Sequence, residues 1–183
     1  MELVGGFDYE RLRRSILQCL QQVNYRVRQY ILDIYRDGLA YEASKRFSIA
    51  AGGGAEILVA NPEGSGVDMY VMDIEVTASG MCFIDMYKDS TYEDIGAEIP
   101  AHSKKIGCDS APKCKVYSGG SYTPGTKIHE TLCYGGEKAF ATGGQVSVGV
   151  GLIVAEGHRL HIALSNPAAE DIYASFRIIW YEE

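Results

Sequence analysis

The stretch AEILVANPEGSGVDMYVMDIEVTASGMCFIDM, residues 55–86, decides the fold. Two turn signals, NPEGSG at residues 61–66 and SG at residues 79–80, divide it into three apolar runs. Proline fixes φ and glycine admits positive φ, so both interruptions predict turns between strands. In the middle run, apolar and polar residues alternate up to Thr77, which is typical of a strand with one buried face.

The first half of this middle strand differs, because Val67, Met69 and Val71 make the other face apolar as well. We therefore expect a neighbouring subunit or the N-terminal helix to cover this second face. The preceding turn is interpreted as structural and not as an active loop. Its defining residues are Asn61, Pro62, Gly64 and Gly66.

The sequence pattern predicts β-structure for the rest of the chain after residue 38 as well. Period-two alternation predicts strands over residues 146–154, 160–164 and 172–181, and shorter strands are expected at 46–50, 113–117 and 127–134. Residues 87–106 are expected to form a crossing loop with at most a short strand. About eight strands without intervening helices predict a mainly β, antiparallel two-sheet sandwich over residues 39–183, most specifically a jelly roll.

Residues 1–38 predict a separate element, one long helix from Asp8 to about Asp37, ended by Gly38. Its apolar residues advance by 3.67 positions per turn on average, closer to an eleven-residue repeat than to a heptad. Such a narrow stripe favours oligomerisation or docking, although packing on the chain's own barrel remains the alternative. The stripe consists of Leu12, Ile16, Cys19, Val23, Val27, Tyr30 and Ile34.

Composition limits the function classes. The net charge of −7 argues against a nucleic-acid-binding protein. No signal peptide and no run of about 20 apolar residues is visible, so we expect synthesis in the host cytoplasm and no membrane span. The five cysteines contain no CxxC pair, and a disulfide between Cys108 and Cys114 stays open.

Motifs for chemistry are absent from the sequence: it contains no phosphate-binding loop, dinucleotide fingerprint, zinc-protease motif or nucleophile elbow. We therefore predict no catalytic residues, no metal site, no cofactor and no enzymatic activity. The four histidines are expected to be solvated or to cap backbone groups. His158 and His161 are three residues apart, so a strand would send them to opposite faces. Tyrosine-rich segments at 87–92 and 117–122 suggest a surface for a host glycan.

Several features together resemble small jelly-roll-like virion-associated proteins of bacterial and archaeal viruses, of the capsid-decoration or head- or tail-fibre type. These features are the segment 55–71, the pairing of the glycine-rich stretch 135–144 with IVAEGH at 153–158, and the ending at 171–183. The resemblance covers residues 46–183 and implies a non-enzymatic module, commonly a homotrimer, that contacts other virion proteins. The N-terminal helix lies outside it.

The leading hypothesis is thus a structural protein of a virion that forms a homo-oligomer, expected to be a trimer, through its helix stripe and sheet faces. Two alternatives remain at the level of sequence. One is a binding module for glycans or a host surface. The other is a single-jelly-roll capsid shell protein.

Overall fold

A computed structural model describes residues 9–135, 145–147 and 151–183. The chain divides into two compact units, residues 1–37 and residues 38–183. Each unit is described by itself.

The first unit contains one helix, α1 (Tyr9–Asp37), of 29 residues. At 1.5 Å per residue it is about 43 Å long. No glycine or proline interrupts it, and Gly38 follows with φ +77°, the left-handed conformation that ends many helices. The predicted helix is confirmed, while its proposed first residue, Asp8, lies outside the described residues.

In the second unit, the regular elements among the described residues are strands. Their bounds are β1 (Ala40–Ile49), β2 (Gly54–Ala60), β3 (Met69–Ala78), β4 (Met81–Lys88), β5 (Thr91–Asp94), β6 (Ala97–Ile99), β7 (Ala101–Ser103), β8 (Lys115–Ser118), β9 (Ser121–Thr123), β10 (Thr126–Tyr134), β11 (Gln145–Ser147), β12 (Leu152–Val154), β13 (Arg159–Ser165) and β14 (Ile172–Glu182). The expected crossing loop over residues 87–106 therefore contains three short strands, β5 to β7.

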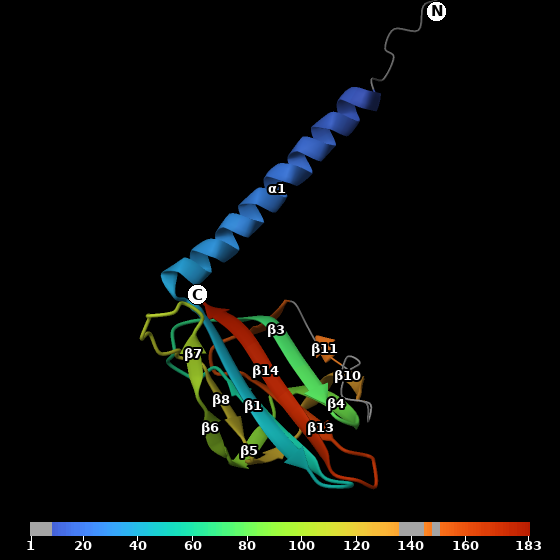
Figure 1. Cartoon of the computed structure of the whole chain (residues 1–183). Coiled ribbons are helices and arrows are strands. Elements are labelled where there is room, and N and C mark those ends of the chain that lie inside the picture. Colours follow the sequence, from blue (N-terminus) through green and yellow to red (C-terminus); the bar gives the residue numbers. More distant parts are fainter. Residues whose placement is uncertain (1–8, 136–144, 148–150) are drawn as a thin grey trace, which may run out of the picture. The chain divides into compact units, whose positions relative to one another are not determined.

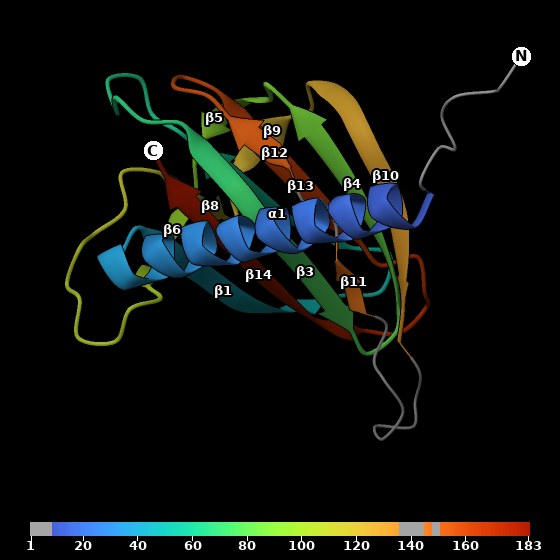
Figure 2. The ribbon, with the colours of Figure 1, turned by 90° about the horizontal axis from the view of Figure 1, so that it is seen from above.

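The strands form two large antiparallel sheets and one small sheet. The first sheet has the order β11-β3-β14-β1-β7, with β12 also paired to β3. The second has the order β10-β4-β13-β2-β8-β6, and β5 pairs with β9. Figure 1 shows β1, β14 and β3 side by side, and Figure 2 shows β4 and β13 on the other side of the unit.

The main strand pairs are nested like those of one long hairpin. β1 pairs with β14, β2 with β13, β3 with β11 and β12, and β4 with β10. Successive pairs alternate between the two large sheets. This is the strand order of a jelly roll, so the predicted fold class is confirmed. The short strands β5 to β9 are an insertion between β4 and β10.

The core lies between the two large sheets. On β14, Phe176, Ile178 and Trp180 are fully buried and face inward, as their alternation predicted. Side chains from β4 and β13 meet them from the other sheet, including Ile84, Met86 and Ile162. Dry packing of both inner faces is what holds such a sandwich together.

The apolar pattern of β3 has an explanation within the unit itself. Opposite β14, Asp73 pairs with Ile179 and Val71 pairs with Trp180, so Met72 has no residue opposite it. This bulge moves the inward-facing positions by one residue, and Met69 and Val71 are buried in the unit's own core. Val67 is half-buried and packs against the same core. This corrects the interpretation of these residues as a second face awaiting a partner.

Candidate assembly surfaces

The helix stripe is largely open in the first unit, because one helix cannot bury its own apolar side chains. Ile16, Val23, Val27 and Tyr30 each expose between 48% and 54% of their surface, and Cys19 is also exposed. Ile34, in the last turn, is buried, and the side chain of Leu12 lies outside the described residues.

Two further residues widen the stripe. Leu20 follows Ile16 by four positions, Ile31 follows Val27 by four, and both are exposed. Residues four apart lie next to each other on a helix surface, so the apolar arc covers about 120° of the circumference. This spacing was visible in the sequence, but the predicted stripe was narrower and did not include Leu20 or Ile31. Contiguous exposed apolar surface of this kind makes the arc a candidate interaction site.

The turn at residues 61–66 is hydrogen-bonded to the end of β12 and to the connection between β12 and β13. Asn61 is buried, and its Nδ2 donates to the carbonyl oxygens of Val67 at 2.7 Å and Val154 at 2.9 Å. The Glu156 carboxylate accepts the backbone N–H groups of Gly64 at 2.6 Å and Gly66 at 3.2 Å. Both glycines have positive φ. The Ser65 N–H donates to the Pro62 carbonyl oxygen at 3.2 Å.

His161 is the one histidine that departs from the expectation of a solvated side chain, because it is almost fully buried. Its Nδ1 lies 3.2 Å from the Ser90 hydroxyl oxygen, and its Nε2 contacts the Glu56 carboxylate. Tyr87 and Tyr122 cover the ring, with centroid distances of 5.4 Å and 5.1 Å. Because β9 carries Tyr122, the small sheet covers this side of the second sheet, which sequence periodicity gave no means of predicting.

A Ser–His–Glu set invites comparison with a hydrolase, but its geometry is that of a structural link. Ser90 is fully buried, and its hydroxyl oxygen accepts the Gly125 N–H at 3.0 Å. A nucleophile must reach its substrate. The cluster instead ties residue 90 and β9 to β13. His158, by contrast, is exposed, and its Nδ1 lies 2.7 Å from Asp89 Oδ1.

The tyrosines considered for glycan binding are partly used in packing. Tyr87 and Tyr122 enclose His161, and the Tyr122 hydroxyl donates to the Ile95 carbonyl at 2.7 Å. Tyr92 remains 41% exposed, with the Arg159 guanidinium 5.2 Å from its ring centroid. In these two segments Tyr87 and Tyr122 thus pack on His161, whereas Tyr92 keeps an accessible ring.

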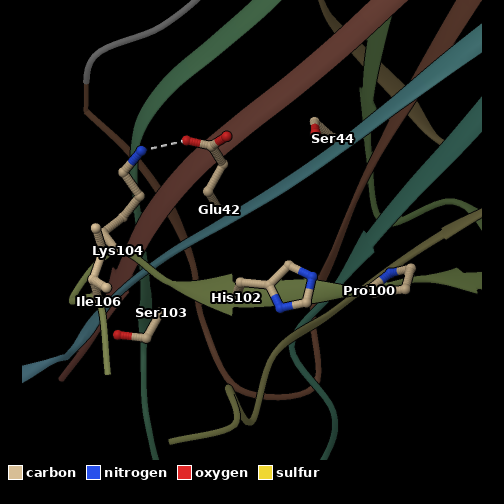
Figure 3. Close-up of a pocket in the computed structure, with 7 residues that line it drawn as sticks. All are labelled: Glu42, Ser44, Pro100, His102, Ser103, Lys104 and Ile106. Atoms are coloured by element: carbon tan, nitrogen blue, oxygen red, sulfur yellow. Dashed lines mark hydrogen bonds and ion pairs between the residues drawn. The ribbon is translucent and has the colours of Figure 1, made fainter. Parts of the chain in front are cut away.

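An open polar pocket of about 520 Å³ lies beside β1 and β7. Figure 3 shows the Lys104 ammonium group directed at the Glu42 carboxylate, 2.5 Å away, with His102 on the neighbouring strand. The strongest charges of the pocket are thus already paired with each other. The lining residues are Glu42, Ser44, Pro100, His102, Ser103, Lys104 and Ile106.

The cysteines are free thiols. Burial raises the pKa of Cys82 to about 11 and also raises the pKa of Cys114 and Cys133. The pKa of Cys108 is lowered, chiefly by hydrogen bonding with Ser110. The disulfide between Cys108 and Cys114 that the sequence left open is not formed. Among the described residues there is no group of three or more His, Cys, Asp or Glu placed to hold a metal ion.

No described helix is both long enough and apolar enough to cross a membrane. The nested strand pairs and α1 define the class of protein: an antiparallel jelly-roll sandwich preceded by one long helix.

No family model matches the chain, and no curated protein matches it. Among solved structures, a chain of the T13 viral particle of IBDV gives a TM-score of 0.15 and 11% identity, covering 78% of this chain and 38% of that chain. A chain of the infectious bursal disease virus VP2 subviral particle gives a TM-score of 0.11 and 10% identity, covering 77% and 41%. This chain spans about two fifths of the length of both. Its fold assignment rests on the strand order described above.

Proposed function

We propose that the chain is a non-enzymatic structural protein of a virion, of the capsid-decorating or fibre type. In this proposal it forms a homo-oligomer, expected to be a trimer, through the apolar arc of α1. The observation that carries the proposal is this arc, because four of its residues leave about half of their surface exposed. A soluble protein covers contiguous apolar surface of that extent with a partner.

Identical helices are suitable partners for the arc. A side chain such as Val23 that is half exposed gains about 1 kcal/mol when a neighbour covers it, so several such side chains on each helix supply a stabilising interface. A spacing of 3.67 residues per turn keeps the arc on one side of a nearly straight helix. Cyclic association of identical helices then places every arc on the common axis.

The virion assignment rests on the resemblance of residues 46–183 to virion-associated modules and agrees with the jelly-roll strand order. Fold alone does not define function, so the assignment requires a direct test. Particles purified on a density gradient from the source culture are analysed by quantitative mass spectrometry and by antibody-labelled electron microscopy.

We expect the chain to sediment with the particles, at a copy number that is a multiple of three, and to label projections or the outer surface. If it is the most abundant protein and labels the whole shell, it is a capsid shell protein and not a decoration. If it is abundant in cells and absent from particles, the virion assignment is wrong.

A further inference from the structure

The helix carries a second, chemically different stripe. Its members advance by four, four, three and four positions, so they lie within an arc of about 80° whose centre is about 140° from that of the apolar arc. Leu17, Tyr25 and Leu32 in this stripe expose 50%, 65% and 58% of their surface. The complete set is Leu17, Gln21, Tyr25, Arg28 and Leu32. A homo-oligomer closed by the apolar arc would leave this second stripe pointing outward.

The charge of the helix indicates what this stripe can bind. Residues 11–32 contain five arginines and no acidic residue, whereas residues 38–183 contain eleven basic and nineteen acidic residues. The arginines of two copies repel each other, which opposes contact between two second stripes. The same arginines attract carboxylates, so an acidic surface is the favoured partner. Every cation of the helix is arginine, whose planar guanidinium can bind a carboxylate with two hydrogen bonds. Tyrosine and arginine are also the residues enriched in protein interfaces.

The β-sandwich offers a surface of matching chemistry. On β4 and β10, Phe83 and Leu132 are directly opposite each other and are 43% and 38% exposed. They line an open groove of about 450 Å³. Asp85 and Glu130, also opposite each other, border it, and Lys127 bridges their carboxylates at 2.9 Å and 3.3 Å. The groove thus combines apolar side chains with a rim of two carboxylates and one ammonium group, which keeps a net charge of −1.

We propose that the second stripe of one chain docks in the β4–β10 groove of a neighbouring copy. Tyr25 and Leu32, which are about 10 Å apart along the helix, would cover Phe83 and Leu132.

The guanidinium of Arg28 would bind Glu130, whose side chain is 76% exposed and therefore accessible to an incoming cation. This inference rests on the proposed function only in taking the apolar arc as already occupied. Its consequence is that oligomers join into larger assemblies.

Charge reversal tests the docking in the full-length chain. Sedimentation velocity from 5 to 100 μM is measured for the wild type, Arg28→Glu, Glu130→Arg and the double variant. We expect the wild type to form concentration-dependent species larger than its basic oligomer, each single variant to lose them, and the double variant to regain them. Gln29→Glu and Glu63→Arg are matched controls outside both surfaces and should behave like the wild type.

The proposal is overturned if the wild type forms nothing larger than its basic oligomer, or if the double variant does not regain the larger species. It is equally overturned if Leu17→Ser and Leu32→Ser instead abolish binding to phosphatidylserine vesicles or to a 30-nucleotide DNA, because the stripe would then bind lipid or nucleic acid. Repeating the series with Ile16→Glu and Val23→Glu separates the two claims. Loss of the basic oligomer then reports the apolar arc, whereas species sensitive to Arg28→Glu still report docking.

Discussion

Glu182 near the end of β14 holds the inserted segment against the sandwich. Its buried carboxylate accepts three N–H groups: Oε1 accepts from the Cys114 amide at 2.9 Å and from Trp180 Nε1 at 3.1 Å, and Oε2 accepts from the Lys113 amide at 2.9 Å. The Glu182→Gln variant keeps the size of this side chain. Its amide NH₂ group, however, meets an N–H donor in place of an acceptor oxygen, so one hydrogen bond is lost and the others lose their charge.

Hydrogen bonds to a charged group contribute about 1.5–3 kcal/mol each, and a buried donor left unsatisfied costs about 1–3 kcal/mol. We therefore expect Glu182→Gln to lower the free energy of unfolding by about 3 kcal/mol and the melting temperature by about 6–12 °C. Urea unfolding followed by the fluorescence of Trp180, the only tryptophan, measures this loss close to the site. The exposed control Glu63→Gln should change stability by less than about 0.5 kcal/mol. A loss for Glu182→Gln equal to that of the control would refute the reasoning.

Three further outcomes are expected. Asn61→Ala removes two hydrogen bonds to backbone carbonyls and should lower the free energy of unfolding, measured by thermal unfolding, by about 1–3 kcal/mol. An unchanged melting curve would show that the turn has no structural role. Met69→Lys places an unpaired charge in the core and should cost more than about 4 kcal/mol. Met72→Lys should cost less, because Met72 is only half-buried and lies at the bulge, and equal circular dichroism melting curves for the two variants would contradict the inward placement of Met69. Cys108 has a lowered pKa, so in the native protein its alkylation rate should rise at a lower pH than that of a cysteine peptide. Cys82, with a pKa raised to about 11, should stay unlabelled at pH 8. Labelling of Cys82 before Cys108 would be inconsistent with these environments.

The sequence predicted those elements whose periodicity is long and undisturbed. The helix was expected to end near Asp37 and does so, and the inward positions of β13 and β14 follow the alternation seen in the chain. The first strand was expected only at residues 46–50 but spans Ala40–Ile49, because the polar residues at 44–46 obscure its pattern. The strands β6, β7 and β9 have three residues each, too few for a period to be visible.

The contacts that fix the loops could not be predicted, because their partners are far apart in the chain. Glu156 binds the turn at residues 61–66 from 90 or more positions away, and Glu182 binds residues 113–114 from 68 or more. The bulge at Met72 has no local signal either, and it made one inward face look like two. On the helix, the apolar arc was visible because its members share polarity. The second stripe was missed because glutamine and arginine stand among its apolar residues.

We expect the apolar arc of α1 to join copies of this chain. Mass photometry at micromolar concentration compares the wild type with Ile16→Glu combined with Val23→Glu, and with the control Gln22→Glu combined with Gln29→Glu, which has the same spacing on another face. We expect the wild type and the control to have three times the chain mass of 20.0 kDa, about 60 kDa, and the arc variant to be a folded monomer. A monomeric wild type, or an arc variant that keeps the oligomeric mass, would contradict this expectation.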